Sequence, residues 1–168
     1  RVMISRYFQL VYDLPDNILM GFDNYTRLNK DIPKIFFTHD NYLRGYTGNV
    51  DSKKDFYDKK TVLLVRKPQD VAVSQFFQWK YRLKSSKRAI NKYPEENSDI
   101  SLFDFVMKSD TGLKWVIGFL NLWAQEAAHM DDFFLLRYED LKKNPVETLE
   151  KLVGFMGAPA HDAHIRAA

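Results

Sequence analysis

Three continuous apolar runs place the strongest constraint on the fold. They are KIFFT at residues 34–38, TVLLV at 61–65 and FFLLRY at 133–138. A strand with one face in water alternates apolar and polar residues, whereas unbroken runs are typical of strands covered on both faces. Segments with helical periodicity lie between the runs. The sequence therefore predicts an α/β domain, in which a parallel sheet carries helices on both faces and the crossovers are right-handed.

The helical segments are predicted from their periodicity and their end signals. Ser101, with Asp104 three residues later, resembles a capping box, while Asn144 precedes Pro145 and Gly157 follows the last apolar position. We expect helices over residues 1–12, 69–86, 101–109, 112–128 and 145–156. The polar stretch at residues 84–99 is expected to form the longest surface loop.

Composition limits the class of protein. The 168 residues suffice for one domain, predicted to span residues 1–168, and 13 Phe, 9 Tyr and 3 Trp argue against disorder. The absence of cysteine excludes disulfides and thiolate metal sites, and fits a reducing compartment, so we expect a cytoplasmic location. A net charge of +3 does not call for nucleic acid. No apolar run reaches about 18 residues, so no membrane span is predicted.

The residues just past the second apolar run suggest an anion site. In VRKPQDVAVS, residues 65–74, Arg66 ends the strand, Pro68 suits the first helical turn and Ser74 follows in the second turn. Ligands of open parallel sheets lie beyond the carboxyl ends of the strands, and a helix N-terminus attracts phosphate. Arg66 and Ser74 could therefore grip one phosphate group. The alternative is that Arg66 pairs with Asp70 and that Ser74 has no special role.

Three motifs together resemble the sulfotransferases that use 3′-phosphoadenylyl sulfate (PAPS). They are FFTHD at 36–40, VRKPQDVAVS at 65–74 and YEDL at 138–141, in the order in which that family carries them. The resemblance implies that Arg66 and Ser74 hold the 3′-phosphate, that Tyr138 contacts the adenine region and that His39 is the general base. It also implies the three-layer fold of that family, which is related to the P-loop NTPases.

The resemblance implies transfer of a sulfuryl group from PAPS to a hydroxyl or amine. The acceptor would be a small molecule, a lipid or a glycan, and no metal is needed. A base such as His39 suits this chemistry independently, because histidine titrates near neutral pH and can remove the acceptor's proton. The basic residues at 82–92 indicate a solvated face, with an acidic or sulfated glycan as the alternative ligand. The sequence identifies neither the acceptor nor the oligomeric state.

The chain departs from the family pattern in two ways. Phe37 stands where many cytosolic members have a lysine before the Thr-His pair. The family's N-terminal PKSGTTW-like phosphosulfate loop and its C-terminal RKG-like segment have no counterpart, so we expect a domain core cut at both ends. These departures leave open a catalytically inactive nucleotide-binding or scaffold domain. A related P-loop kinase is a further alternative, although no Walker-type glycine loop is present.

Overall fold

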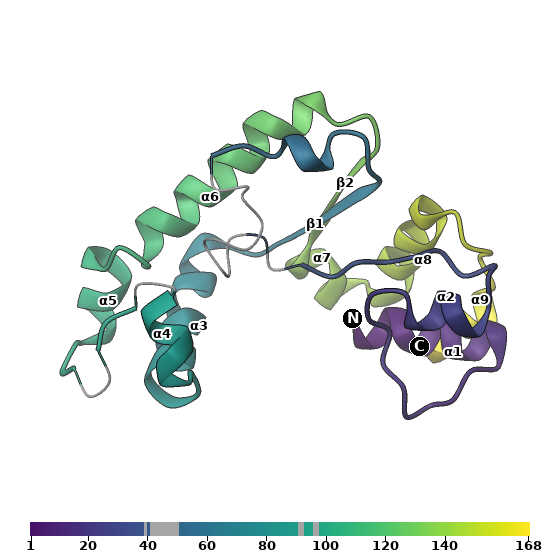
Figure 1. The fold of residues 1–168 in the computed structure, drawn as a ribbon, viewed down its shortest axis with the longest axis horizontal. Coiled ribbons are helices and arrows are strands. Elements are labelled where there is room, and N and C mark those ends of the chain that lie inside the picture. The colour runs from purple at the N-terminus through teal and green to yellow at the C-terminus, as the bar shows by residue number, and fades with distance from the viewer. Residues whose placement is uncertain (39, 41–50, 91–92, 96–97) are drawn as a thin grey trace. The chain divides into compact units, whose positions relative to one another are not determined.

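The computed structural model describes residues 1–38, 40, 51–90, 93–95 and 98–168 (Figure 1). The chain divides into two compact units. The first comprises Arg1–Thr38, Val62–Leu64 and Phe134–Ala168, and the second comprises His39–Thr61 and Val65–Phe133.

In chain order the elements are α1 (Val2–Tyr12), α2 (Asn24–Leu28), the 3₁₀ helix η2 (Lys54–Phe56), β1 (Thr61–Val65), α3 (Pro68–Tyr81), α4 (Ser85–Ile90), α5 (Leu102–Lys108), α6 (Leu113–Glu126), the 3₁₀ helix η3 (Ala127–His129), β2 (Phe133–Arg137), α7 (Tyr138–Lys143), α8 (Pro145–Met156) and α9 (Asp162–Ala167).

The first unit is built on a core between helices. Its buried side chains come from α1, α2, α8 and α9 and from the connections before and after α2, and they are Tyr7, Phe8, Met20, Tyr25, Ile32, Leu149, Val153 and Ile165. The hydroxyl of Tyr7 donates to the carbonyl of Pro159, which fastens the chain just before α9 to α1. Burying large aromatic and aliphatic side chains of this kind contributes about 1.5–3 kcal/mol each.

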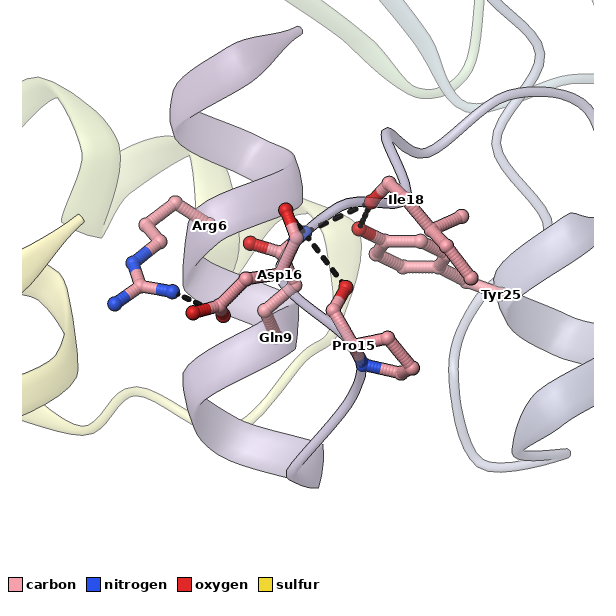
Figure 2. Close-up of polar contacts among 6 residues, drawn as sticks. All are labelled: Arg6, Gln9, Pro15, Asp16, Ile18 and Tyr25. Atoms are coloured by element: carbon pink, nitrogen blue, oxygen red, sulfur yellow. Dashed lines mark hydrogen bonds and ion pairs between the residues drawn. The ribbon is translucent and has the colours of Figure 1, made fainter.

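A polar network fixes the turn that follows α1 (Figure 2). The side-chain amide nitrogen of Gln9, Nε2, donates to the backbone carbonyls of Pro15 and Asp16, both at 3.2 Å, and to that of Ile18 at 2.8 Å. The hydroxyl of Tyr25 donates to the same Ile18 carbonyl at 2.5 Å. Buried backbone carbonyls need hydrogen-bond partners, and the buried side chain of Gln9 supplies one to three carbonyls of this turn. Gln9 therefore holds the turn against α1.

The sheet consists of the paired strands β1 and β2, which run parallel (Figure 1). Both strands lie where the sequence predicts them, except that Tyr138 begins α7 instead of ending β2. Phe134 of β2 packs against Phe155 of α8, with ring centroids 5.3 Å apart. On the sheet, however, Val62, Leu64 and Leu135 are exposed. The α/β character is thus confirmed in coarse form, and helices on both faces stay a prediction.

The predicted strand at residues 34–38 is wrong. These residues have no regular secondary structure. Ile35 and Phe37 pack against the helical core of the first unit, whereas Phe36 is exposed and meets Phe22 edge-on at 5.0 Å. The apolar run thus buries two of its side chains against helices, which requires no ladder of backbone hydrogen bonds, so the β-rich composition does not decide the conformation.

An aromatic core holds the second unit together. Phe76 and Trp79 of α3 surround Phe105 of α5, with centroid distances to Phe105 of 5.5 and 5.1 Å. The indole nitrogen of Trp79 donates to the carbonyl of Pro94 at 2.9 Å. The helix predicted over residues 69–86 buries Phe76, but Phe77 and Tyr81 are exposed, so its apolar face is narrower than the sequence predicts. The helix ends at Tyr81, and a separate helix, α4, begins at Ser85 inside the predicted loop.

The predicted helix ends are confirmed in two of three cases. The Ser101 hydroxyl accepts from the Asp104 backbone N–H at 3.0 Å and caps α5. Gly157 ends α8 with φ of 74°, a left-handed conformation that glycine adopts without strain. Asn144 precedes α8, but its side chain makes no capping hydrogen bond. Gly112 has a different role, because a Cβ there would lie 2.4 Å from the Val106 carbonyl oxygen where α5 meets α6.

Ser101→Ala is expected to lower the free energy of unfolding by about 1 kcal/mol, the usual effect of losing a cap. The hydroxyl also donates to the Asp104 carboxylate at 2.8 Å, so two contacts are lost. Urea unfolding of the purified chain measures the effect. Asn144→Ala is the matched control and should change stability much less, since Asn144 makes no cap bond. Equal losses in the two variants would contradict the assigned role of Ser101.

Candidate functional site

Arg66 lies at the carboxyl end of β1, as the sequence predicts. The strand ends at Val65 and α3 begins at Pro68, so Arg66 stands two residues before a helix N-terminus. Its Nη2 contacts Asp70 Oδ2 at 3.3 Å, and the two side chains are 39% and 48% exposed. The ion pair that sequence analysis weighed as the alternative is therefore present. An exposed pair of this kind contributes only about 0.2–1 kcal/mol, so it does not prevent Arg66 from binding a stronger anionic ligand.

Ser74 is exposed on α3, one turn beyond Asp70. Residues four apart on a helix share a face, so Ser74 and Asp70 lie on the same side of α3, and Arg66 reaches that side through its contact with Asp70. Three groups that can donate to an anion thus lie near the start of α3. They are the guanidinium of Arg66, the free N–H groups of the helix N-terminus and the hydroxyl of Ser74. This arrangement can bind a phosphate or sulfate group.

The other two predicted site residues are less constrained. Tyr138 opens α7, directly after β2, and its side chain is 39% exposed. It belongs to the first unit, whereas Arg66 and Ser74 belong to the second, so its part in a nucleotide site stays a prediction. His39 lies outside the described residues, and its role as general base also stays a prediction.

The second unit contains a buried ion pair that sequence analysis missed. Lys53 Nζ lies 2.7 Å from Asp40 Oδ2, and the two side chains are 0% and 6% exposed. The indole nitrogen of Trp123, on α6, donates to the same carboxylate oxygen at 2.9 Å. Lys53 lies in the charged stretch DSKKDFYDKK, which has the composition of a solvated surface, so the sequence carries no signal for its burial.

Glu126, at the end of α6, also fixes the segment around Lys53, through three hydrogen bonds that its carboxylate accepts. Its Oε2 accepts from the Lys53 backbone N–H at 2.7 Å, from the Tyr57 hydroxyl at 2.9 Å and from the Ser52 hydroxyl at 3.3 Å. The bond from the Lys53 N–H, and then that from Tyr57, hold the pKa of Glu126 below its ordinary value of 4.5. Since the folded-state pKa is the lower one, this contribution to stability is present above pH 4.5 and is lost as the pH falls.

The basic residues at 82–92 do not form one continuous solvated face. Arg82, Lys84 and Lys87 are exposed, whereas Arg88 is buried at 8% exposure. Lys92 lies outside the described residues. The solvated-face prediction is therefore confirmed for three of the five cations and wrong for Arg88.

The described residues show neither a metal-binding cluster nor a membrane-spanning helix. Among them, no three His, Cys, Asp or Glu side chains are grouped so that they could hold a metal ion. Over the same part of the chain, no helix has the length and apolar character needed to cross a membrane. That the chemistry needs no metal stays a prediction.

Comparison with known proteins identifies related chains. The family model described as "Sulfotransferase domain" matches residues 27–167. Sulfotransferase 2A2 of Rattus norvegicus is 27% identical over 138 residues, which are 82% of this chain and 42% of that protein. Sulfotransferase 2A6 of Rattus norvegicus is 29% identical over 63% of this chain and 34% of that protein, and Sulfotransferase 2A1 of Mus musculus is 27% identical over 77% and 41%. The chain thus spans less than half the length of these relatives. No solved structure matches it significantly.

Proposed function

This chain belongs to the sulfotransferase family, and we propose that it carries part of a site that transfers a sulfuryl group from PAPS to a hydroxyl or amine. The observation that carries the proposal is the placement of Arg66 and Ser74 around the start of α3, directly after β1 and within the residues that the family model matches. A guanidinium and a hydroxyl at a helix N-terminus fit a phosphate group of the donor.

Each residue has a distinct part in the proposal. Arg66 and Ser74 hold the 3′-phosphate and so select PAPS over nucleotides without that group. Tyr138 seats the adenine, for which an exposed aromatic side chain beside a strand end is suited. Binding the donor at several points positions its sulfuryl group for in-line attack.

His39 receives the proton in the proposed reaction. The acceptor oxygen or nitrogen forms a bond to sulfur while the bond between sulfur and the bridging oxygen of the donor's 5′-phosphate breaks. The acceptor's proton passes to the imidazole nitrogen of His39, and the electron pair of the broken bond leaves with adenosine 3′,5′-bisphosphate. No electrons enter or leave the system, so no further reactant is required.

Several wider predictions accompany this function. The complete domain has the three-layer fold related to the P-loop NTPases, and residues 1–168 belong to one such domain. Its acceptor is a small molecule, a lipid or a glycan, no nucleic acid is bound, and the protein is cytoplasmic. A catalytically inactive nucleotide-binding domain is the second candidate, favoured by Phe37 at the position where many family members carry a lysine.

Arg66→Ala is expected to weaken binding of adenosine 3′,5′-bisphosphate by about 1.5–3 kcal/mol, the range for a hydrogen bond to a charged group. Binding of adenosine 5′-monophosphate, which lacks the 3′-phosphate, should barely change. Isothermal calorimetry with both nucleotides on the full-length protein measures the difference. Because Asp70 competes for the same guanidinium, Asp70→Asn should change the affinity for the bisphosphate in the opposite direction.

Arg82→Ala is the matched control for this experiment. Arg82 is an exposed arginine that follows the C-terminal end of α3, so its loss removes the same charge from the far end of the same helix. We expect both affinities to stay near those of the unaltered protein. If Arg66→Ala weakened both nucleotides equally, Arg66 would not be the ligand of the 3′-phosphate.

A further inference from the structure

The segment at residues 71–94, which includes most of α3, the connection after it and α4, differs in charge from the rest of the chain. It contains six lysine and arginine residues and no aspartate or glutamate, whereas the remaining residues hold 19 Lys and Arg and 22 Asp and Glu. Four of the six cations are exposed, and they are Lys80, Arg82, Lys84 and Lys87. The positive net charge of the protein therefore comes from one short segment of the second unit.

Two aromatic side chains are exposed beside these cations, at the C-terminal end of α3. Phe77 is 42% exposed and Tyr81 is 68% exposed, and their rings stack with centroids 6.2 Å apart and an interplanar angle of 16°. Residues three and four apart on a helix share a face, so Phe77, Lys80 and Tyr81 lie on the same side of α3. The opposite side of the helix packs into the aromatic core of the unit.

A surface that combines exposed rings with cations is suited to an anionic lipid bilayer. Lysine and arginine side chains attract anionic headgroups, and each one near the membrane strengthens binding by about fivefold. Aromatic side chains are favoured at the level of the headgroups, where their rings leave water. Because the ring of Phe77 has no polar atom, a partner with an apolar layer beneath its charges suits it better than a purely polar one.

Two other occupants fit this surface less well. A second copy of the chain, docked through the same surface, would bring like charges together. Single-stranded nucleic acid binds to aromatic faces that are open to its bases, whereas Phe77 and Tyr81 stack on each other. The rest of the chain, which holds more acidic than basic residues, would also repel a long polyanion that reached beyond the segment.

We propose that Phe77 and Tyr81, together with the exposed cations Lys80, Arg82 and Lys84, dock the protein onto the surface of an anionic lipid bilayer. The two rings enter the headgroup region, and the cations contact the headgroup phosphates and carboxylates. The cytoplasmic leaflet, which carries phosphatidylserine, is a surface of this kind. The inference goes beyond the proposed function and does not depend on it, since none of these five residues is assigned to the donor or to the reaction.

The test is co-sedimentation of the full-length protein with vesicles of phosphatidylcholine mixed with phosphatidylserine, and with vesicles of phosphatidylcholine alone. We expect binding to the mixed vesicles, and added salt should weaken it because salt screens the surface charge. The double variant Arg82→Gln/Lys84→Gln should lower the partition coefficient by about 25-fold, at about fivefold for each cation. Phe77→Ser/Tyr81→Ser should lower it by about tenfold, because less apolar surface leaves water.

Two substitutions outside the surface are matched controls. Phe22→Ser removes an aromatic side chain that is 63% exposed in the first unit. Lys114→Gln removes an exposed cation from α6, in the same unit as the surface but outside the segment without acidic residues. We expect both variants to bind the mixed vesicles as the unaltered protein does.

Several results would overturn the inference. They are equal binding to both kinds of vesicle, binding to neither, and binding that neither double variant weakens. Binding to heparin or to single-stranded DNA without binding to the mixed vesicles would assign the surface to a soluble polyanion instead. Phe77 also meets Phe76 of the aromatic core, with ring centroids 5.4 Å apart, so if Phe77→Ser/Tyr81→Ser does not fold, the variant of the exposed Arg82 and Lys84 decides. No measurement uses PAPS, so failure of the proposed function and failure of this inference are distinguishable.

Discussion

Lys53→Met is expected to lower the free energy of unfolding by about 3–5 kcal/mol, because it leaves the Asp40 carboxylate buried without its ammonium partner. Methionine is only one atom shorter than lysine and is favoured in an apolar site, so lost packing contributes little. The Trp123 N–H still reaches the carboxylate, but a neutral donor does not replace the charge. Urea unfolding followed by tryptophan fluorescence is a suitable measurement, since Trp123 lies in the cluster.

Two further variants separate the ion pair from general effects of substitution. Lys59→Met removes an exposed lysine from an exposed pair, and we expect it to cost no more than about 1 kcal/mol. The double variant Asp40→Asn/Lys53→Met should be more stable than Lys53→Met alone, because it leaves no buried charge unpaired. If Lys53→Met were as mild as Lys59→Met, the pair would not be buried in solution as the structure has it.

His39→Ala in the full-length protein is expected to lower kcat by about 10²–10⁴-fold, the usual contribution of a general base. The affinity for adenosine 3′,5′-bisphosphate should stay nearly unchanged, since Arg66, Ser74 and Tyr138 are proposed to supply it. Turnover of labelled PAPS gives the first quantity and calorimetry gives the second. The contrast matters because a variant that merely unfolds would lose both.

The control for this variant is His161→Ala. His161 is exposed at the start of α9, in the first unit, and contacts the ring of His164. We expect its loss to leave both turnover and nucleotide affinity unchanged. Full activity of His39→Ala would show that another group accepts the proton.

Lys53→Met reports on the free energy of the fold, whereas His39→Ala reports on the chemical step. If the first prediction holds and the unaltered full-length protein turns over no PAPS, the result favours the inactive nucleotide-binding domain, the second candidate function.

Local signals in the sequence are sufficient for the five longest helices and for both strands of the described residues, whereas the shorter helices α2, α4, α7 and α9 are not predicted. The runs at 61–65 and 133–137 form β1 and β2, and Ser101 and Gly157 mark helix ends where expected. These features depend on residues within one turn or one strand, so short-range periodicity and capping chemistry determine them. The motif around Arg66 is equally local, since a strand end and a helix start are joined by a few residues.

Tertiary structure alone decided the features that depend on distant partners. The apolar run at 34–38 predicts a strand, but Ile35 and Phe37 pack against helices. Composition alone cannot distinguish these two environments. Asp40, Lys53 and Trp123 are far apart in the chain. A lysine or an aspartate in a charged stretch normally stays in water, because the cost of desolvating one charge is offset only when an opposite charge and a hydrogen-bond donor meet it in the folded protein.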